Sequence, residues 1–267
     1  MNAIEVSNLS KDFGSVRALN GVSFVVPIGS ITGFLGPNGA GKSTTMNILI
    51  GAISATAGTA KLFDEIVSVN NVASRKSLGF LTNSTALDRT LTVGQELDYF
   101  SHLDGQDYSN YTKQLVEQLD LNLSQKIVGL STGNYQKVAL IIALMSKPKL
   151  LILDEPTNGL DPLVQAEFNN IILQLRDSGS SIFISSHILS EVDQLCDEFI
   201  FIKNGKIVGQ LSKAELNQQN GGTITITASA NDRTRVLEVL RKNRIDYQLA
   251  AGDLDQIFRK YYEDSHA

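Results

Sequence analysis

A glycine-rich stretch that ends in a lysine and two hydroxyl residues is the part of this chain best suited to hold phosphate groups. Residues 36–44, GPNGAGKST, fit the pattern G-x-x-x-x-G-K-[ST], in which backbone amides surround the phosphates of a nucleotide. Glycine permits a close approach of the backbone to the ligand. Lys42 is expected to reach the β- and γ-phosphates, and the Ser43 hydroxyl to ligate Mg²⁺. The residues expected to bind the nucleotide here are Asn38, Gly39, Ala40, Gly41, Lys42, Ser43 and Thr44.

The elements on both sides of this stretch agree with phosphate binding. Residues 30–35, SITGFL, predict a buried strand that leads into it, and a helix that starts there would direct its positive end at the anion. Strand, loop and helix together predict a site for a nucleoside triphosphate.

Two adjacent carboxylates end a second apolar run. Residues 149–153, KLLIL, precede Asp154 and Glu155. Such a run suits a strand buried on both faces of a parallel sheet, whose C-terminal end is where ligands bind in open α/β sheets. Asp154 is expected to hold Mg²⁺ through water, and Glu155 to polarise the water that attacks the γ-phosphate. Alone, the pair would equally fit a strand that ends in solvated acids, but the phosphate loop favours the catalytic interpretation.

Four further motifs lie elsewhere in the chain. They are LSTGNYQK at residues 130–137, GLDP at 159–162, ISSH at 184–187 and KDFG at 11–14. With the two motifs above, the set resembles the ATP-binding cassette (ABC) ATPases, in which these segments are the signature motif, the D-loop, the switch histidine and the loop that places an aromatic ring against adenine. The six motifs span residues 1 to about 212 in the family's order, and the likeness is greatest to the separate ATPase subunits of ABC exporters.

The resemblance implies a head-to-tail dimer in which ATP lies between one copy's phosphate loop and the other's signature motif. Ser131 and Gly133 would then complete the nucleotide site across the dimer, although a serine before a predicted helix is by itself an ordinary N-cap. His187 would contact the γ-phosphate, although a histidine at a strand end is often only a capping residue. Asp161 would link the two sites, and without the family likeness it would be a turn residue before a helix that starts with proline.

Adenine recognition is expected near the N-terminus. The resemblance implies that Phe13 stacks on the base and Val16 packs beside the ribose. An aromatic ring stacks on any base, so ATP is favoured by the family likeness alone. Phe13 would equally serve as an apolar anchor of the first hairpin.

Two positions depart from the family pattern. Asn83 stands where the Q-loop usually has glutamine, so its shorter amide reaches less far toward Mg²⁺ or the catalytic water. In the signature motif, Thr132 replaces a usual glycine and Asn134 a usual glutamine. Because Ser131 and Gly133 are present, we expect a functional site with slower turnover.

The fold class expected from these motifs is an α/β P-loop cassette with a mixed-sheet core, an antiparallel β subdomain and a helical subdomain. The cassette is predicted over residues 1–220, with antiparallel strands in the first 30 residues and the helical subdomain at about 83–146. Residues 221–267 predict a small β-α-β-α appendage that resembles the tails of many exporter ATPases. Its role is left open between regulation, dimerisation and packing on the core.

Composition narrows the class of function. The 267 residues are 42% hydrophobic but hold no run of about eighteen apolar residues, so no membrane span is expected. No secretion signal is predicted at the start, and the single cysteine, Cys196, suits the cytosol and is expected to be buried. The formal net charge of −5 argues against binding to nucleic acid.

The predicted function is an ATPase subunit, with ATP and Mg²⁺ as ligands, that powers an ABC transporter of the exporter type. The expected partners are a second cassette, in a homodimer or heterodimer, and separate membrane-spanning permease subunits that hold the chain at the cytoplasmic face of the membrane. Two alternatives are a soluble ABC ATPase of protein or cofactor assembly and a weakly hydrolysing regulatory subunit.

Overall fold

The structure, a computed structural model, describes residues 2–82, 85–103, 105–188, 192–219, 239 and 242. The chain forms two compact units, Met1–Gln210 and Leu211–Ala267, and each is considered by itself. Asn83 lies outside the described residues, as does the appendage predicted over residues 221–267 except for residues 239 and 242. The domain boundary at 220 therefore stays a prediction.

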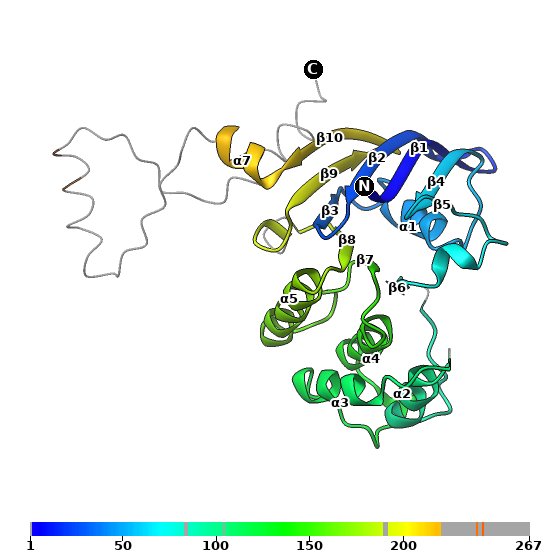
Figure 1. Ribbon diagram of the computed structural model, residues 1–267, viewed down its shortest axis with the longest axis vertical. Helices are drawn as coiled ribbons and strands as arrows, with labels where there is room; N and C mark the ends of the chain where they lie inside the picture. The colour runs from blue at the N-terminus through cyan, green and yellow to red at the C-terminus, as the bar shows by residue number, and fades with distance from the viewer. Residues whose placement is uncertain are drawn as a thin grey trace. The chain divides into compact units, whose positions relative to one another are not determined.

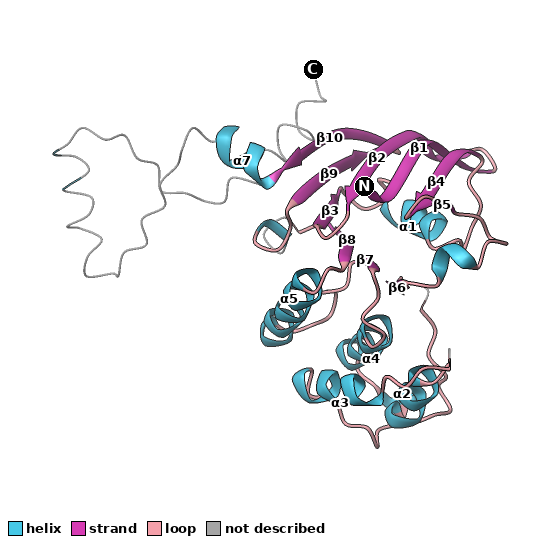
Figure 2. Cartoon of the chain, in the orientation of Figure 1, coloured by secondary structure: helices cyan, strands magenta, loops and turns pink. Residues whose placement is uncertain are grey.

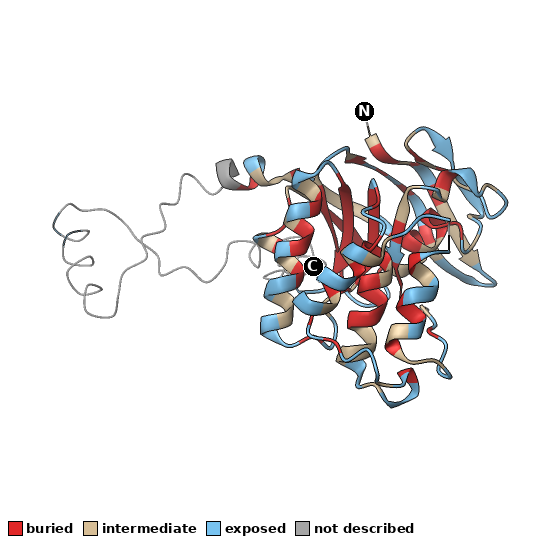
Figure 3. Ribbon diagram, turned by 60° about the horizontal axis from the view of Figure 1, so that its bottom comes forward, coloured by how far each residue is buried: buried red, intermediate tan, exposed pale blue. Residues whose placement is uncertain are grey.

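A six-stranded sheet forms the centre of the first unit. Its strands are ordered β10-β9-β3-β8-β7-β6 (Figure 2). From β9 to β6 the neighbouring strands run parallel. Three central strands consist entirely of buried residues, as expected for apolar runs covered on both faces, and Figure 3 shows this buried layer in red. The strands are β3 (Ile31–Leu35), β6 (Leu78–Leu81), β7 (Leu150–Asp154), β8 (Ser181–Ser186), β9 (Glu198–Lys203) and β10 (Lys206–Ser212).

A second sheet, of four antiparallel strands, confirms the antiparallel segment predicted at the N-terminus. Its order is β2-β1-β4-β5. The strands are β1 (Asn2–Phe13), β2 (Val16–Pro27), β4 (Ala57–Leu62) and β5 (Glu65–Ile66).

The two sheets share one apolar core. Phe24 of the antiparallel sheet lies with its ring centroid 5.5 Å from the rings of Phe34 and Phe183 in the central sheet, a distance typical of attractive aromatic pairs. Met46 from helix α1 (Lys42–Leu49) is fully buried in the same cluster. The helix that follows the phosphate loop is therefore anchored to both sheets.

The predicted helical segment contains three α-helices, α2 (Val93–Ser101), α3 (Ser109–Gln118) and α4 (Thr132–Leu144), which gather together in Figure 1. Thr92 and Gln95 form a capping box at the start of α2, which fixes where that helix begins. Leu115 of α3 and Leu119, which directly follows it, are fully buried. Short 3₁₀ turns lie at Ala73–Arg75 and Ile127–Gly129.

Two further helices are α5 (Pro162–Asp177) and α7 (Lys213–Gln219). Cys196 is fully buried, as predicted. In the described part of the chain, no helix combines the length and apolar character that crossing a bilayer requires.

Candidate nucleotide site

The phosphate loop links the buried strand β3 to helix α1, as the sequence predicts. Two of its glycines have left-handed backbone conformations, with φ of 79° at Gly39 and 112° at Gly41. At Gly41 a side chain would also collide, because a Cβ atom would lie 2.7 Å from Leu19 Cδ2. The loop thus requires glycine for both conformation and space.

Lys42 is folded back over the loop and is only 5% exposed. Its Nζ donates to the carbonyl oxygen of Gly36 at 2.7 Å and to that of Pro37 at 3.4 Å. The same Nζ lies 3.4 Å from Glu155 Oε1. The buried ammonium group is therefore held by acceptors of this chain at the place where phosphate oxygens are expected.

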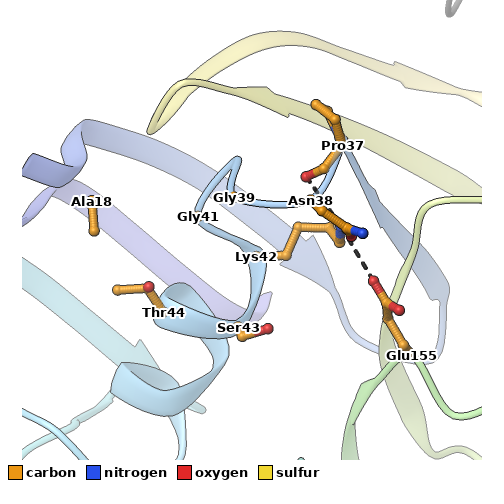
Figure 4. A pocket seen from close by; sticks show the side chains of 9 residues that line it. All are labelled: Ala18, Pro37, Asn38, Gly39, Gly41, Lys42, Ser43, Thr44 and Glu155. Atoms are coloured by element: carbon orange, nitrogen blue, oxygen red, sulfur yellow. Dashed lines mark hydrogen bonds and ion pairs between the residues drawn. The ribbon is translucent and has the colours of Figure 1, made fainter. Parts of the chain in front are cut away.

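A polar pocket of about 350 Å³ opens over this loop (Figure 4). This volume is within the range typical of small-ligand sites. The lining consists of Ala18, Pro37, Asn38, Gly39, Gly41, Lys42, Ser43, Thr44 and Glu155. Ala40, also named from sequence, is not among the described residues that line this pocket. It is buried, and its carbonyl oxygen accepts from Gly205 N.

The two carboxylates take different positions at the end of β7. Asp154 is buried, and its Oδ1 accepts a hydrogen bond of 2.6 Å from the hydroxyl of Ser185 on β8. Glu155 follows in a left-handed conformation, with φ of 48°, an uncommon state for a residue other than glycine. Its backbone N–H donates to Ser185 Oγ at 2.9 Å, and its side chain enters the pocket.

Three side chains surround the carboxylate of Glu155. Lys42 approaches Oε1, whereas Oε2 accepts from Asn158 Nδ2 at 2.7 Å and lies 3.2 Å from His187 Nδ1. His187 comes to this place because β8 is the immediate neighbour of β7, with Ser185 opposite Asp154. The structure thus brings together Lys42, Glu155 and His187, three residues predicted to act on the γ-phosphate.

The surroundings of Glu155 keep it ionised. Partial burial by itself raises the pKa of this carboxyl group, but the hydrogen bond from Asn158 and the charges of Lys42 and His187 outweigh it. The net result is a pKa below the ordinary value. Above that pKa, Glu155 is an acceptor that can polarise a water molecule.

The donors present fit a magnesium ion. Ser43 supplies a hydroxyl to the pocket, and Asp154 supplies a buried carboxylate at the end of β7. Mg²⁺ prefers such oxygen ligands and is commonly held by one or two protein groups together with substrate phosphates. Asn83, the third residue named for this role, lies outside the described residues.

The signature and D-loop residues lie at helix starts. Ser131 is exposed and caps α4, with its Oγ accepting from Asn134 N at 3.2 Å. Asp161 caps α5 through Leu163 N at 3.0 Å and Val164 N at 3.1 Å. Gly133 packs so closely on the D-loop that a Cβ atom there would lie 2.6 Å from Gly159 O. Among the described residues that line the pocket, none is Ser131, Gly133 or Asp161, so their action on nucleotide stays a prediction.

The residues predicted to contact adenine and ribose lie near the first hairpin turn. Phe13 and Val16 flank the turn between β1 and β2 and are exposed, and Lys11 Nζ lies 5.0 Å from the Phe13 ring centroid. Their contacts with base and ribose stay predictions. Ala18 lines the pocket but was not among the predicted residues. No local pattern pointed to it, because the pairing of β1 with β2 shifts register between Lys11 and Asp12 and interrupts the strand alternation at Ala18.

A phosphate loop between a buried strand and a helix, faced by two carboxylates from a parallel strand, defines a P-loop nucleoside triphosphatase. The family model described as "ABC transporter" matches residues 19–158, about half of the chain. A second model, "AAA domain, putative AbiEii toxin, Type IV TA system", matches residues 124–193, which include the two carboxylates but not the phosphate loop.

Similar proteins agree with the first of these models. The bacitracin transport ATP-binding protein of Bacillus licheniformis is 33% identical over 258 residues, which cover 96% of this chain and 84% of the relative. The lantibiotic transport ATP-binding protein of Streptococcus pyogenes is 38% identical over 210 residues, covering 77% and 89%. A solved structure, the ATP-binding subunit of an ABC transporter, matches with a TM-score of 0.76 at 27% identity over 88% of this chain and 99% of its own. The chain belongs to the ABC transporter family, as an ATP-binding domain.

Proposed function

We propose that this chain hydrolyses ATP with Mg²⁺ and that hydrolysis drives export through separate membrane-spanning subunits. The observation that carries the proposal is a phosphate-loop pocket lined by Lys42 and Glu155, with His187 in contact with the carboxylate of Glu155. A loop that only bound nucleotide would need neither an ionised carboxylate in its pocket nor a histidine held against that carboxylate.

The arrangement suggests how binding prepares the reaction. Lys42 Nζ lies 3.4 Å from Glu155 Oε1 and is paired with it. Phosphate oxygens would compete for the same ammonium group and release the carboxylate toward water. The water oxygen then attacks the γ-phosphorus, the bond to the β–γ bridging oxygen breaks, and Glu155 accepts the proton from water. Mg²⁺ held by Ser43 and Asp154 would neutralise charge on the phosphates.

A second cassette would complete the site. Ser131 stands exposed at the start of α4, a helix of 13 residues, and backbone amides at such a helix end favour an anion. Because its own chain's pocket is lined by other residues, the natural ligand of this helix end is the γ-phosphate on a second copy or a related cassette. ATP would then hold the two cassettes together, and its hydrolysis would release them.

The names of the relatives support transport. Two are ATP-binding proteins of bacitracin and lantibiotic transport. Compounds of these kinds are therefore the first substrates to test in an export assay. A chain of this kind would work at the cytoplasmic face of the membrane, attached through the permease subunits. Loss of the gene is expected to sensitise cells to a compound only where that compound is exported.

The proposal is tested by purifying the Glu155→Gln variant from gently solubilised membranes with ATP present. We expect a membrane protein with several spans to co-purify in equal amounts. The Lys42→Ala variant, which lacks the phosphate-binding amine, provides the control for a nucleotide-dependent interaction. Recovery with soluble partners alone would contradict the transport proposal and favour an assembly ATPase.

A further inference from the structure

We propose that Asn158 is a positioning residue for the carboxylate of Glu155. This inference rests on the proposed role of Glu155 in hydrolysis and adds a residue to it. The contact is direct: Asn158 Nδ2 donates to Glu155 Oε2 at 2.7 Å, a shorter distance than those from Lys42 or His187.

The contact divides the two carboxylate oxygens between different tasks. Oε2 faces two nitrogen groups, Asn158 Nδ2 and His187 Nδ1. Among the described residues, the ion-pair partner of Oε1 is Lys42. Once phosphate oxygens take over Lys42, Oε1 becomes the oxygen free to accept from water, while Oε2 stays fixed. Asn158 thereby prevents rotation of the carboxylate away from the pocket.

Asn158 is well placed to fix this rotation, because it also closes the turn on which Glu155 sits. Its backbone N–H donates to the carbonyl oxygen of Glu155 at 3.2 Å. One residue thus binds both the main chain and the side chain of the glutamate, three positions earlier. The left-handed conformation of Glu155 turns the chain so that these two contacts form together.

The loop itself is held by contacts that do not involve the Asn158 side chain. Gln136 Nε2 of α4 donates to the carbonyl oxygen of Pro156 at 3.0 Å, and Gly133 packs directly against Gly159. Removal of the Asn158 amide should therefore leave the loop in place and affect the carboxylate specifically.

Two substitutions of Asn158 separate positioning from simple space filling. Asn158→Ala removes the donor, and Asn158→Asp keeps the size and the tendency to form turns but presents a carboxylate instead of an NH₂ group. We expect kcat to fall about tenfold in the alanine variant, the size expected for a hydrogen bond to a charged group, and further in the aspartate variant. KM for ATP should be unchanged in the alanine variant. The matched control is Asn170→Ala, on the exposed side of α5, which should behave as wild type.

The decisive readout is a double variant in the full-length chain, assayed together with any membrane subunit that co-purifies. If Asn158 acts through Glu155, adding Asn158→Ala to Glu155→Gln lowers the residual rate no further. An equal loss in both backgrounds, or an aspartate variant as active as wild type, would overturn the inference. Wild-type turnover by Glu155→Gln alone would instead overturn the proposed role of the glutamate.

Discussion

Two helices in this molecule begin with a similar local structure but in different surroundings. Helix α1 begins at the glycine-rich loop and helix α4 at Ser131, and both direct backbone amides outward. Around the start of α1, the chain supplies a pocket, a buried lysine and an ionised glutamate. Around the start of α4 it supplies an exposed serine that caps its own helix. A helix end becomes a site only where other elements build the rest. The start of α1 has a pocket around it, and the start of α4 would become part of a site only against a second cassette, as we propose.

Substitution of Glu155, the proposed acceptor of the water proton, should produce the largest effect and tests the site at the start of α1. Glu155→Gln is expected to lower ATP turnover about 100-fold or more, because the amide cannot accept the proton of water. ATP affinity should be preserved, which steady-state phosphate release and equilibrium binding can show together. Glu167→Gln, the same change on the exposed face of α5, is the control; equal turnover in the two variants would contradict the assigned role.

Loss of the buried amine tests the same region through binding. Lys42→Ala removes the group held by two loop carbonyls and Glu155, and leaves that carboxylate facing the incoming phosphates. We expect the Kd for ATP to rise about 10- to 100-fold, since hydrogen bonds to charged groups are worth ~1.5–3 kcal/mol each. Fluorescence titration measures it, with the exposed Lys149→Ala as control. An unchanged Kd would remove Lys42 from the site.

Variants of Ser131 test whether the start of α4 meets a phosphate. Ser131→Ala should lower turnover about tenfold while a single chain still binds ATP with wild-type affinity, and it should cost ~1 kcal/mol of stability through the lost cap. Ser131→Asp separates the two effects, because aspartate caps a helix well but repels a phosphate. It should retain the melting temperature and lose turnover. Wild-type turnover in Ser131→Asp would mean that this helix end meets no phosphate.

The smallest predicted effect lies away from both sites. The bond of the His102 ring to the Asp98 carbonyl oxygen raises the pKa of that histidine above 6.5, and the carboxylates of Asp107 and Asp98 add to it. Because the folded state binds the proton more tightly, the contribution to stability is present at low pH and is lost as the pH rises through the folded pKa. An NMR titration should show a pKa that falls in Asp107→Asn; an unshifted pKa in wild type would contradict this account.

The sequence predicted the strands around the nucleotide site better than the contacts between their side chains. The apolar runs at 30–35 and 149–153 predict β3 and β7 to within one residue at each end, because local periodicity and composition suffice for buried strands. The pairing of His187 with Glu155 depends on β8 lying beside β7, and strand order is a long-range property that no local pattern contains. Asn158 was missed for a related reason: a donor three residues after a glutamate is unremarkable until the turn between them is known.

The most direct test of the central claim, that a second cassette completes the nucleotide site, is the sedimentation of the Glu155→Gln chain with ADP and with ATP. We predict a monomer of 29.0 kDa with ADP and a dimer at saturating ATP, and we predict that adding Ser131→Asp abolishes the dimer. A chain that stays monomeric at saturating ATP, or a dimer that Ser131→Asp leaves intact, would contradict this account.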